Sequence, residues 1–132
     1  MVAAAVVRSL WDAVQARDWI GARALLAADL VVEWPHTGEL FGGADLFIDV
    51  QREYPGDWQV EVEEVLGVGD RVAAQVVIDA GAGGIYRCAG FYEVSGGRIT
   101  DAVEYWVEEG AEAAPLWRTD LVARGPEAPS SN

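Results

Sequence analysis

The segment GGRITDAVEYWVEE, residues 96–109, decides how the rest of the chain is arranged. Its Gly-Gly pair is typical of a tight turn, and the residues that follow predict a strand. Side chains alternate in direction along a strand, which divides the residues between two faces. One face holds Ala102, Glu104 and Trp106, and the other holds Val103, Tyr105 and Val107. Neither face is uniformly polar, so we expect a second layer on each side of this strand.

Glu104 is the exceptional residue of this strand, because it shares its face with Trp106. A carboxylate in such a position either pairs with a cation in the core or lines a cavity. The opposite register, with Glu104 turned outward, stays open because a slip of one residue reverses every side chain.

Four strands with turn signals between them make up the second half of the chain. We predict them at residues 58–68, 71–79, 85–94 and 99–108, as an antiparallel meander. A short apolar segment, Pro115 to Val122, is expected to fold over the open end of the sheet. We assign residues 1–124 to a single domain and Gly125 to Asn132 to a disordered tail, on composition.

Helical spacing of apolar residues dominates the first half. It predicts helices at residues 4–16, 19–28 and 44–54, with a short strand at 30–34 that Pro35 ends. Residues 37–43 are expected to form a loop.

Composition excludes several classes of protein. No apolar run approaches the roughly 20 residues of a membrane span, so we expect no membrane-spanning segment. No signal peptide is recognisable, so we expect the protein to be cytoplasmic. The formal net charge of −13, without any basic cluster, argues against nucleic acid binding. Cys88 and His36 are the only soft ligands, which are too few for a zinc or iron site, and we expect neither metal nor cofactor.

The order of these elements resembles the NTF2-like superfamily and, within it, the SnoaL-like polyketide cyclase group. The most specific passages are EWPHTGELFGGADLF, residues 33–47, and GFYEVSGGRITDAVEYW, residues 90–106. The resemblance implies an α+β fold in which a curved, mixed or antiparallel sheet wraps around three N-terminal helices as a cone. It also implies a pocket at the mouth of the cone and a homodimer formed through the convex face of the sheet.

For function, the resemblance implies general acid/base chemistry in an apolar pocket, of the cyclase, isomerase or dehydratase type. We expect Glu104 to be the acid/base and His36 its partner, with a small hydrophobic, cyclic or polyketide-like molecule as the substrate. The residues expected to contact that molecule are aromatic: Trp11, Trp34, Tyr54, Tyr92, Trp106 and Trp117.

The match to individual activities of the superfamily is partial. Ketosteroid isomerase has its base near the end of the first strand, where this chain has His36 and no aspartate. Its oxyanion-binding tyrosine falls near Trp11, which has no hydroxyl. Limonene epoxide hydrolase has an aspartate where this chain has Glu104, but the arginine and second aspartate of its triad fall near Gln75 and Val77.

Other interpretations remain open from the sequence. Glu104 would be purely structural if it formed a buried salt bridge with Arg87 or Arg118. Independently of this, His36 is open to interpretation as a loop histidine at the rim of the cone. The same cone would also suit a protein that binds a hydrophobic molecule without converting it. A module that binds other proteins through its outer surface has less support, because most large aromatic residues fall on faces predicted to point inward.

Overall fold

A computed structural model describes residues 1–122 of the chain, which contain three α-helices, six strands and two short 3-10 turns. The helices are α1 (Ala3–Gln15), α2 (Trp19–Ala24) and α3 (Ala44–Glu53). The strands are β1 (Leu26–Trp34), β2 (Glu39–Gly42), β3 (Gln59–Val68), β4 (Arg71–Asp79), β5 (Ile85–Ser95) and β6 (Arg98–Glu108). The 3-10 turns are η1 (Gly81–Gly83) and η2 (Leu116–Arg118).

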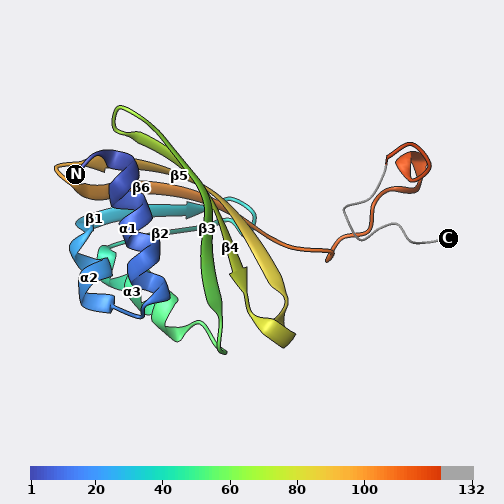
Figure 1. Ribbon diagram of the computed structural model, residues 1–132, viewed down its shortest axis with the longest axis horizontal. Helices are drawn as coiled ribbons and strands as arrows, with labels where there is room; N and C mark the ends of the chain where they lie inside the picture. Colours follow the sequence, from blue (N-terminus) through green and yellow to red (C-terminus); the bar gives the residue numbers. More distant parts are fainter. Residues whose placement is uncertain (123–132) are drawn as a thin grey trace.

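The strands form one mixed sheet in the order β2-β1-β6-β5-β4-β3. All neighbours are antiparallel except β1 and β6, which run parallel. The sheet is open, and the helices cover one of its faces (Figure 1). The expected α+β class, with a curved sheet against three N-terminal helices, is confirmed.

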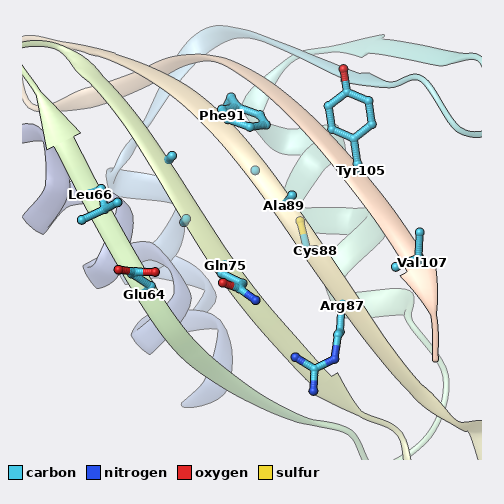
Figure 2. A pocket seen from close by; sticks show the side chains of 12 residues that line it. Glu64, Leu66, Gln75, Arg87, Cys88, Ala89, Phe91, Tyr105 and Val107 are labelled. Carbon is cyan, nitrogen blue, oxygen red and sulfur yellow. The ribbon is translucent and has the colours of Figure 1, made fainter. Parts of the chain in front are cut away.

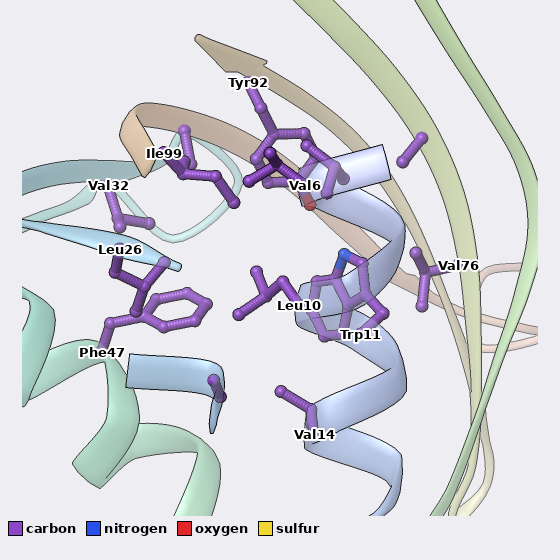
Figure 3. Packing of buried hydrophobic residues seen from close by; sticks show 14 of the residues in the cluster. Val6, Leu10, Trp11, Val14, Leu26, Val32, Phe47, Val76, Tyr92 and Ile99 are labelled. Atoms are coloured by element: carbon purple, nitrogen blue, oxygen red, sulfur yellow. The ribbon is translucent and has the colours of Figure 1, made fainter. Parts of the chain in front are cut away.

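The core lies between α1 and the inner face of the sheet. The predicted apolar stripe of α1 is buried, with Leu10 and Trp11 at its centre. Figure 3 shows these side chains facing Val76 and Tyr92 of the sheet on one side and Phe47 of α3 on the other. Burial of such a continuous apolar surface fixes α1 across the strands.

The second helix is shorter than the sequence predicts. It ends at Ala24, and β1 begins at Leu26, four residues before the predicted start of this strand. The Leu25 carbonyl accepts a hydrogen bond from the Ile99 amide, and Leu26 lies opposite Ile99 in the parallel pair with β6. Pairing with a strand more than 70 residues away therefore overrides the helical preference of the alanine-rich segment.

The segment expected to be a loop, residues 37–43, contains strand β2. Pro35 and Gly38 lie in the turn of a hairpin whose arms are β1 and β2, with Trp34 opposite Glu39. The positive φ of Gly38, 78°, suits glycine in this turn. The hairpin is too short to show a period in sequence, and it carries His36 and Thr37 at its tip.

The C-terminal segment does not close the sheet. Figure 1 shows residues 110–122 extending away from it, and the side chains of Leu116 and Trp117 are 90% and 74% exposed. The apolar residues of this segment were visible in the sequence, but their pattern does not reveal what they pack against. The tail predicted at Gly125 to Asn132 lies outside the described residues. Within residues 1–122, no helix is both long and apolar enough to span a membrane.

Candidate functional site

Glu104 points into the protein from the middle of β6, as the strand pattern predicted. Its exposure is 0%, and two neutral donors bind its carboxylate. The indole Nε1 of Trp34 donates to Oε1 at 3.0 Å, and the Tyr92 hydroxyl donates to Oε2 at 2.6 Å. Trp34 comes from β1 and Tyr92 from β5, the two neighbours of β6 in the sheet.

Burial raises the pKa of Glu104 above the ordinary glutamate value, because the ionised form loses its hydration. Donation from Tyr92 and Trp34 opposes this rise, and the nearby N–H of Trp106 and the charge of a protonated His36 oppose it more weakly. Burial, together with the negative charge of Glu104, also raises the pKa of Tyr92 well above its usual range. Tyr92 therefore keeps its proton and acts as a donor.

The short contact between Tyr92 and Glu104 depends on a glycine. Gly90 lies opposite Glu104 in the β5–β6 pair and on the same face of β5 as Tyr92. A Cβ atom at position 90 would lie 2.3 Å from the Tyr92 hydroxyl oxygen and 2.6 Å from its Cζ. Glycine at this position leaves the space that the phenol ring occupies.

Two more indoles complete the surroundings of the carboxylate. Trp106 packs edge-to-face on Trp11, with ring centroids 6.2 Å apart. The Nε1 atoms of both rings are buried and make no full hydrogen bond with any described residue. Burial raises the pKa of both Glu104 and Tyr92, and these N–H groups offset part of the rise, that of Trp106 at Glu104 and that of Trp11 at Tyr92.

A cavity of about 500 Å³ opens next to this network. That volume is in the range of small-molecule sites. Aromatic and aliphatic side chains form its walls: Trp34, Tyr54, Tyr86, Trp106, Val50 and Ile78. Polar side chains complete its lining: His36, Thr37, Glu39, Gln51 and Glu53. Glu104 does not line the cavity. The rings of Trp34 and Trp106 line it instead, and they form the wall next to the buried carboxylate.

The structure brings four of the predicted site residues to this cavity, namely Trp34, His36, Tyr54 and Trp106. Tyr92 and Trp11 lie behind the cavity wall, where they contact Glu104 and Trp106 respectively. Trp117 is exposed on the C-terminal segment and is not among the lining residues. His36 lies at the hairpin tip and makes no hydrogen bond with Glu104.

The structure does not contain the salt bridge considered from the sequence. Arg87 is on the outer side of the sheet, where it binds Glu63 at 3.1 Å and Glu109 at 2.6 Å. Arg118 lies near Trp117 on the C-terminal segment. Among the described residues, Glu104 is therefore compensated by neutral donors and by no arginine.

Sequence reasoning missed Tyr86, Gln51 and two carboxylates of the lining, Glu39 and Glu53. Tyr86 was identifiable in principle, because it lies on the same face of β5 as Cys88 and Tyr92. Glu39 was not, because its orientation depends on the unpredicted strand β2. The positions discussed for an epoxide hydrolase triad also need correction: Gln75 and Val77 point outward, and the inward neighbours Val76 and Ile78 are apolar.

The outer face of the sheet carries a separate, shallow groove of about 360 Å³ (Figure 2). The rings of Phe91 and Tyr105 pack edge-to-face beside it, with their centroids 6.3 Å apart. Leu66 and Val107 lie along its borders. These side chains are about half exposed or more.

No group of three potential metal ligands in residues 1–122 is arranged to hold an ion.

Comparisons with known proteins agree with this architecture. The model of the SnoaL-like domain family matches residues 7–102. A crystal structure from Kribbella flavida DSM 17836, provisionally described as a ketosteroid isomerase, is 33% identical, with a TM-score of 0.83 over 94% of this chain and 90% of the other.

Two more distant structures share the fold alone. An LEH-like epoxide hydrolase of M. tuberculosis is 22% identical, with a TM-score of 0.67 over 80% of this chain and 82% of the other. A protein from Xanthomonas campestris pv. campestris, provisionally described as a polyketide cyclase, is 20% identical, with a TM-score of 0.66 over 80% and 90%. No curated protein sequence matches the chain.

Proposed function

The chain belongs to the SnoaL-like domain family, and from its site we propose that it is a small-molecule enzyme that uses Glu104 for general acid/base chemistry. The observation that carries this proposal is a completely buried carboxylate that has neutral hydrogen-bond donors and no cationic partner among the described residues. Burial in such surroundings raises the pKa of Glu104 above the ordinary glutamate value. A carboxyl group with a pKa near the working pH exchanges protons efficiently.

The substrate proposed for this site is a small hydrophobic molecule, cyclic or polyketide-like. The walls of the cavity support this choice, since six of its lining side chains are aromatic or aliphatic. Cyclisation, isomerisation and dehydration all require a proton to be removed at one position and returned at another, which one carboxyl group can do. Thr37, Gln51 and His36 are the polar groups available to orient the molecule.

Direct proton transfer requires contact between the substrate and Glu104, which has no exposed surface in the structure. We propose that the Trp106 side chain moves aside when the substrate binds. Trp34 is held by its hydrogen bond to Glu104 and by the edge of Phe41, whose centroid is 5.0 Å away. Trp106 has no hydrogen bond to lose, because its Nε1 atom is without a partner in the described residues.

A thermal-shift screen of hydrophobic small molecules, followed by a turnover assay on those that bind, tests the proposal. A ligand at ~100 times its dissociation constant stabilises the protein by about 2.7 kcal/mol, which such a screen detects. Glu104→Gln keeps the shape of the side chain, and we expect a ~100-fold or larger loss of kcat, which is much larger than any accompanying change in ligand affinity. His36→Ala is expected to have a smaller effect. Unchanged turnover in the double variant would refute catalysis by this pair.

The alternative function is that of a non-catalytic binding protein for the same kind of molecule. The complete burial of Glu104 favours this alternative, because a group behind the cavity wall fixes the position of Trp34 without touching a ligand. A bound molecule recovered chemically unchanged, with Glu104→Gln altering affinity only, would identify this function.

We also propose that two copies of the chain associate through the outer face of the sheet. The exposed side chains of Leu66, Phe91, Tyr105 and Val107 around the groove in Figure 2 support this proposal, since apolar groups gathered on one face are typical of an interface. Sedimentation at micromolar concentration is the test. A mass of one chain would contradict it, and Tyr105→Glu is expected to convert a dimer to monomers.

A further inference from the structure

We infer that the natural ligand of the cavity carries a positively charged amino group on its hydrophobic body. This inference rests on the proposed function, because it concerns the molecule that occupies the same cavity. It follows from how aromatic rings and carboxylates are distributed around the lining, to which no lysine or arginine within residues 1–122 contributes.

The walls offer several aromatic rings to a cation. Trp34, Tyr54, Tyr86 and Trp106 all line the cavity, and they come from β1, the end of α3, β5 and β6 respectively. An ammonium group over the face of an aromatic ring is attracted by the negative charge of the π-system, most strongly for tryptophan. Several rings around one cavity are the arrangement that recognises quaternary and other organic ammonium groups.

The hydrogen bond from Trp34 to Glu104 strengthens this preference. The Trp34 N–H donates to a carboxylate oxygen at 3.0 Å on the side away from the cavity. Donation to an acceptor of negative charge pushes electron density into the indole ring, which makes its face more attractive to a cation. The buried carboxylate therefore influences a ligand even while the indole separates the two.

The charged groups of the lining are mainly acidic. Glu39 and Glu53 both line the cavity, and neither forms a salt bridge with another residue between positions 1 and 122. Burial raises the pKa of Tyr54, and the negative charge of nearby Glu108 adds to this rise. Among the residues that the structure describes, His36 is the one basic side chain of the lining. A carboxylate or phosphate entering here would meet like charges, whereas an ammonium group would meet opposite ones.

The aromatic rings and the carboxylates of the lining both favour a positive charge on the ligand. The apolar walls accommodate a ring or chain, and the cation lies between the aromatic faces and the carboxylates of Glu39 and Glu53. Neutral ligands of the same shape gain the burial but neither electrostatic contribution.

Three soluble probes with one hydrophobic body test the inference: 3-phenylpropylamine, which is protonated at pH 8, the neutral 3-phenylpropan-1-ol, and the anion 3-phenylpropionate. Binding is measured by calorimetry at low salt and pH 8, where an ordinary histidine is neutral. We expect the amine to bind at least tenfold more tightly than the alcohol and the acid to bind least. The double variant Glu39→Gln/Glu53→Gln should reduce the preference for the amine severalfold and leave the alcohol unchanged.

A matched variant controls for net charge. Asp12→Asn/Glu61→Gln also removes two exposed carboxylates, but neither residue lines the cavity, and the preference for the amine should be retained. Equal or tighter binding of the alcohol, or a preference that Glu39→Gln/Glu53→Gln leaves intact, would overturn the inference. Failure of all three probes to bind would overturn it too.

The proposed enzyme activity survives the first of these results, because the alcohol would still occupy the cavity. Its own test is the effect of Glu104→Gln on turnover, which does not depend on the charge of the ligand.

Discussion

Removing one hydroxyl, with Tyr92→Phe, tests whether Glu104 is held as a buried, hydrogen-bonded carboxyl group. The change leaves the ring in place and deletes the 2.6 Å donor to Oε2 of a side chain with no exposed surface. A hydrogen bond to a charged group contributes about 1.5–3 kcal/mol, and one between neutral groups about 0.5–1.5 kcal/mol. We therefore expect Tyr92→Phe to lower the free energy of unfolding by roughly 2 kcal/mol at a pH above the raised pKa of Glu104, where the group is ionised, and by about 1 kcal/mol at a pH below it.

Equilibrium unfolding in urea measures this effect, at one fixed protein concentration because association would otherwise change apparent stability. With a slope of ~1.5 kcal/mol/M, a loss of 2 kcal/mol moves the midpoint by roughly 1.3 M. Tyr105→Phe is the control, since that tyrosine is partly exposed on the outer face and should change stability by less than about 0.5 kcal/mol. In a double-mutant cycle, the cost of Tyr92→Phe should shrink when Glu104 is already glutamine. An equal cost in both backgrounds, or at both pH values, would refute the reasoning.

Three further predictions concern the same network and its surroundings. Because burial raises the pKa of Glu104 from 4.5, the folded state binds more protons than the unfolded state above that pH. The difference in the free energy of unfolding, wild type minus Glu104→Gln, should therefore fall as pH rises through the folded pKa, and then level off. Denaturant titrations at several pH values measure this difference. Gly90→Ala should destabilise the fold by about 1–3 kcal/mol, because its Cβ would displace the Tyr92 ring, and thermal unfolding should show no such loss for the double variant Gly90→Ala/Tyr92→Ala relative to Tyr92→Ala alone. Trp117→Ala should leave ligand affinity and stability within about 0.5 kcal/mol of the wild type, because this side chain is largely exposed and outside the cavity; a larger loss of calorimetric affinity would place the C-terminal segment at the site after all.

The sequence by itself determined the local periods and what they imply. Alternation along β6 was enough to place Glu104 on one face with Trp106 and to place Tyr105 and Val107 on the other. The apolar stripe of α1 was likewise sufficient to bury Trp11. These features depend on the geometry of a single strand or helix, so nearby residues carry all the information they need.

Only the tertiary structure decided which residues surround Glu104 and what lines the cavity. Its two donors, Trp34 and Tyr92, are 70 and 12 residues away in sequence, and the first meets it only because β1 pairs in parallel with β6. The same pairing ended α2 early, and the unpredicted strand β2, which pairs with β1, brought Glu39 to the lining of the cavity. Such contacts arise from the pairing of distant strands, whose partners and register are set by the whole sheet and leave no periodic signal in the segments themselves.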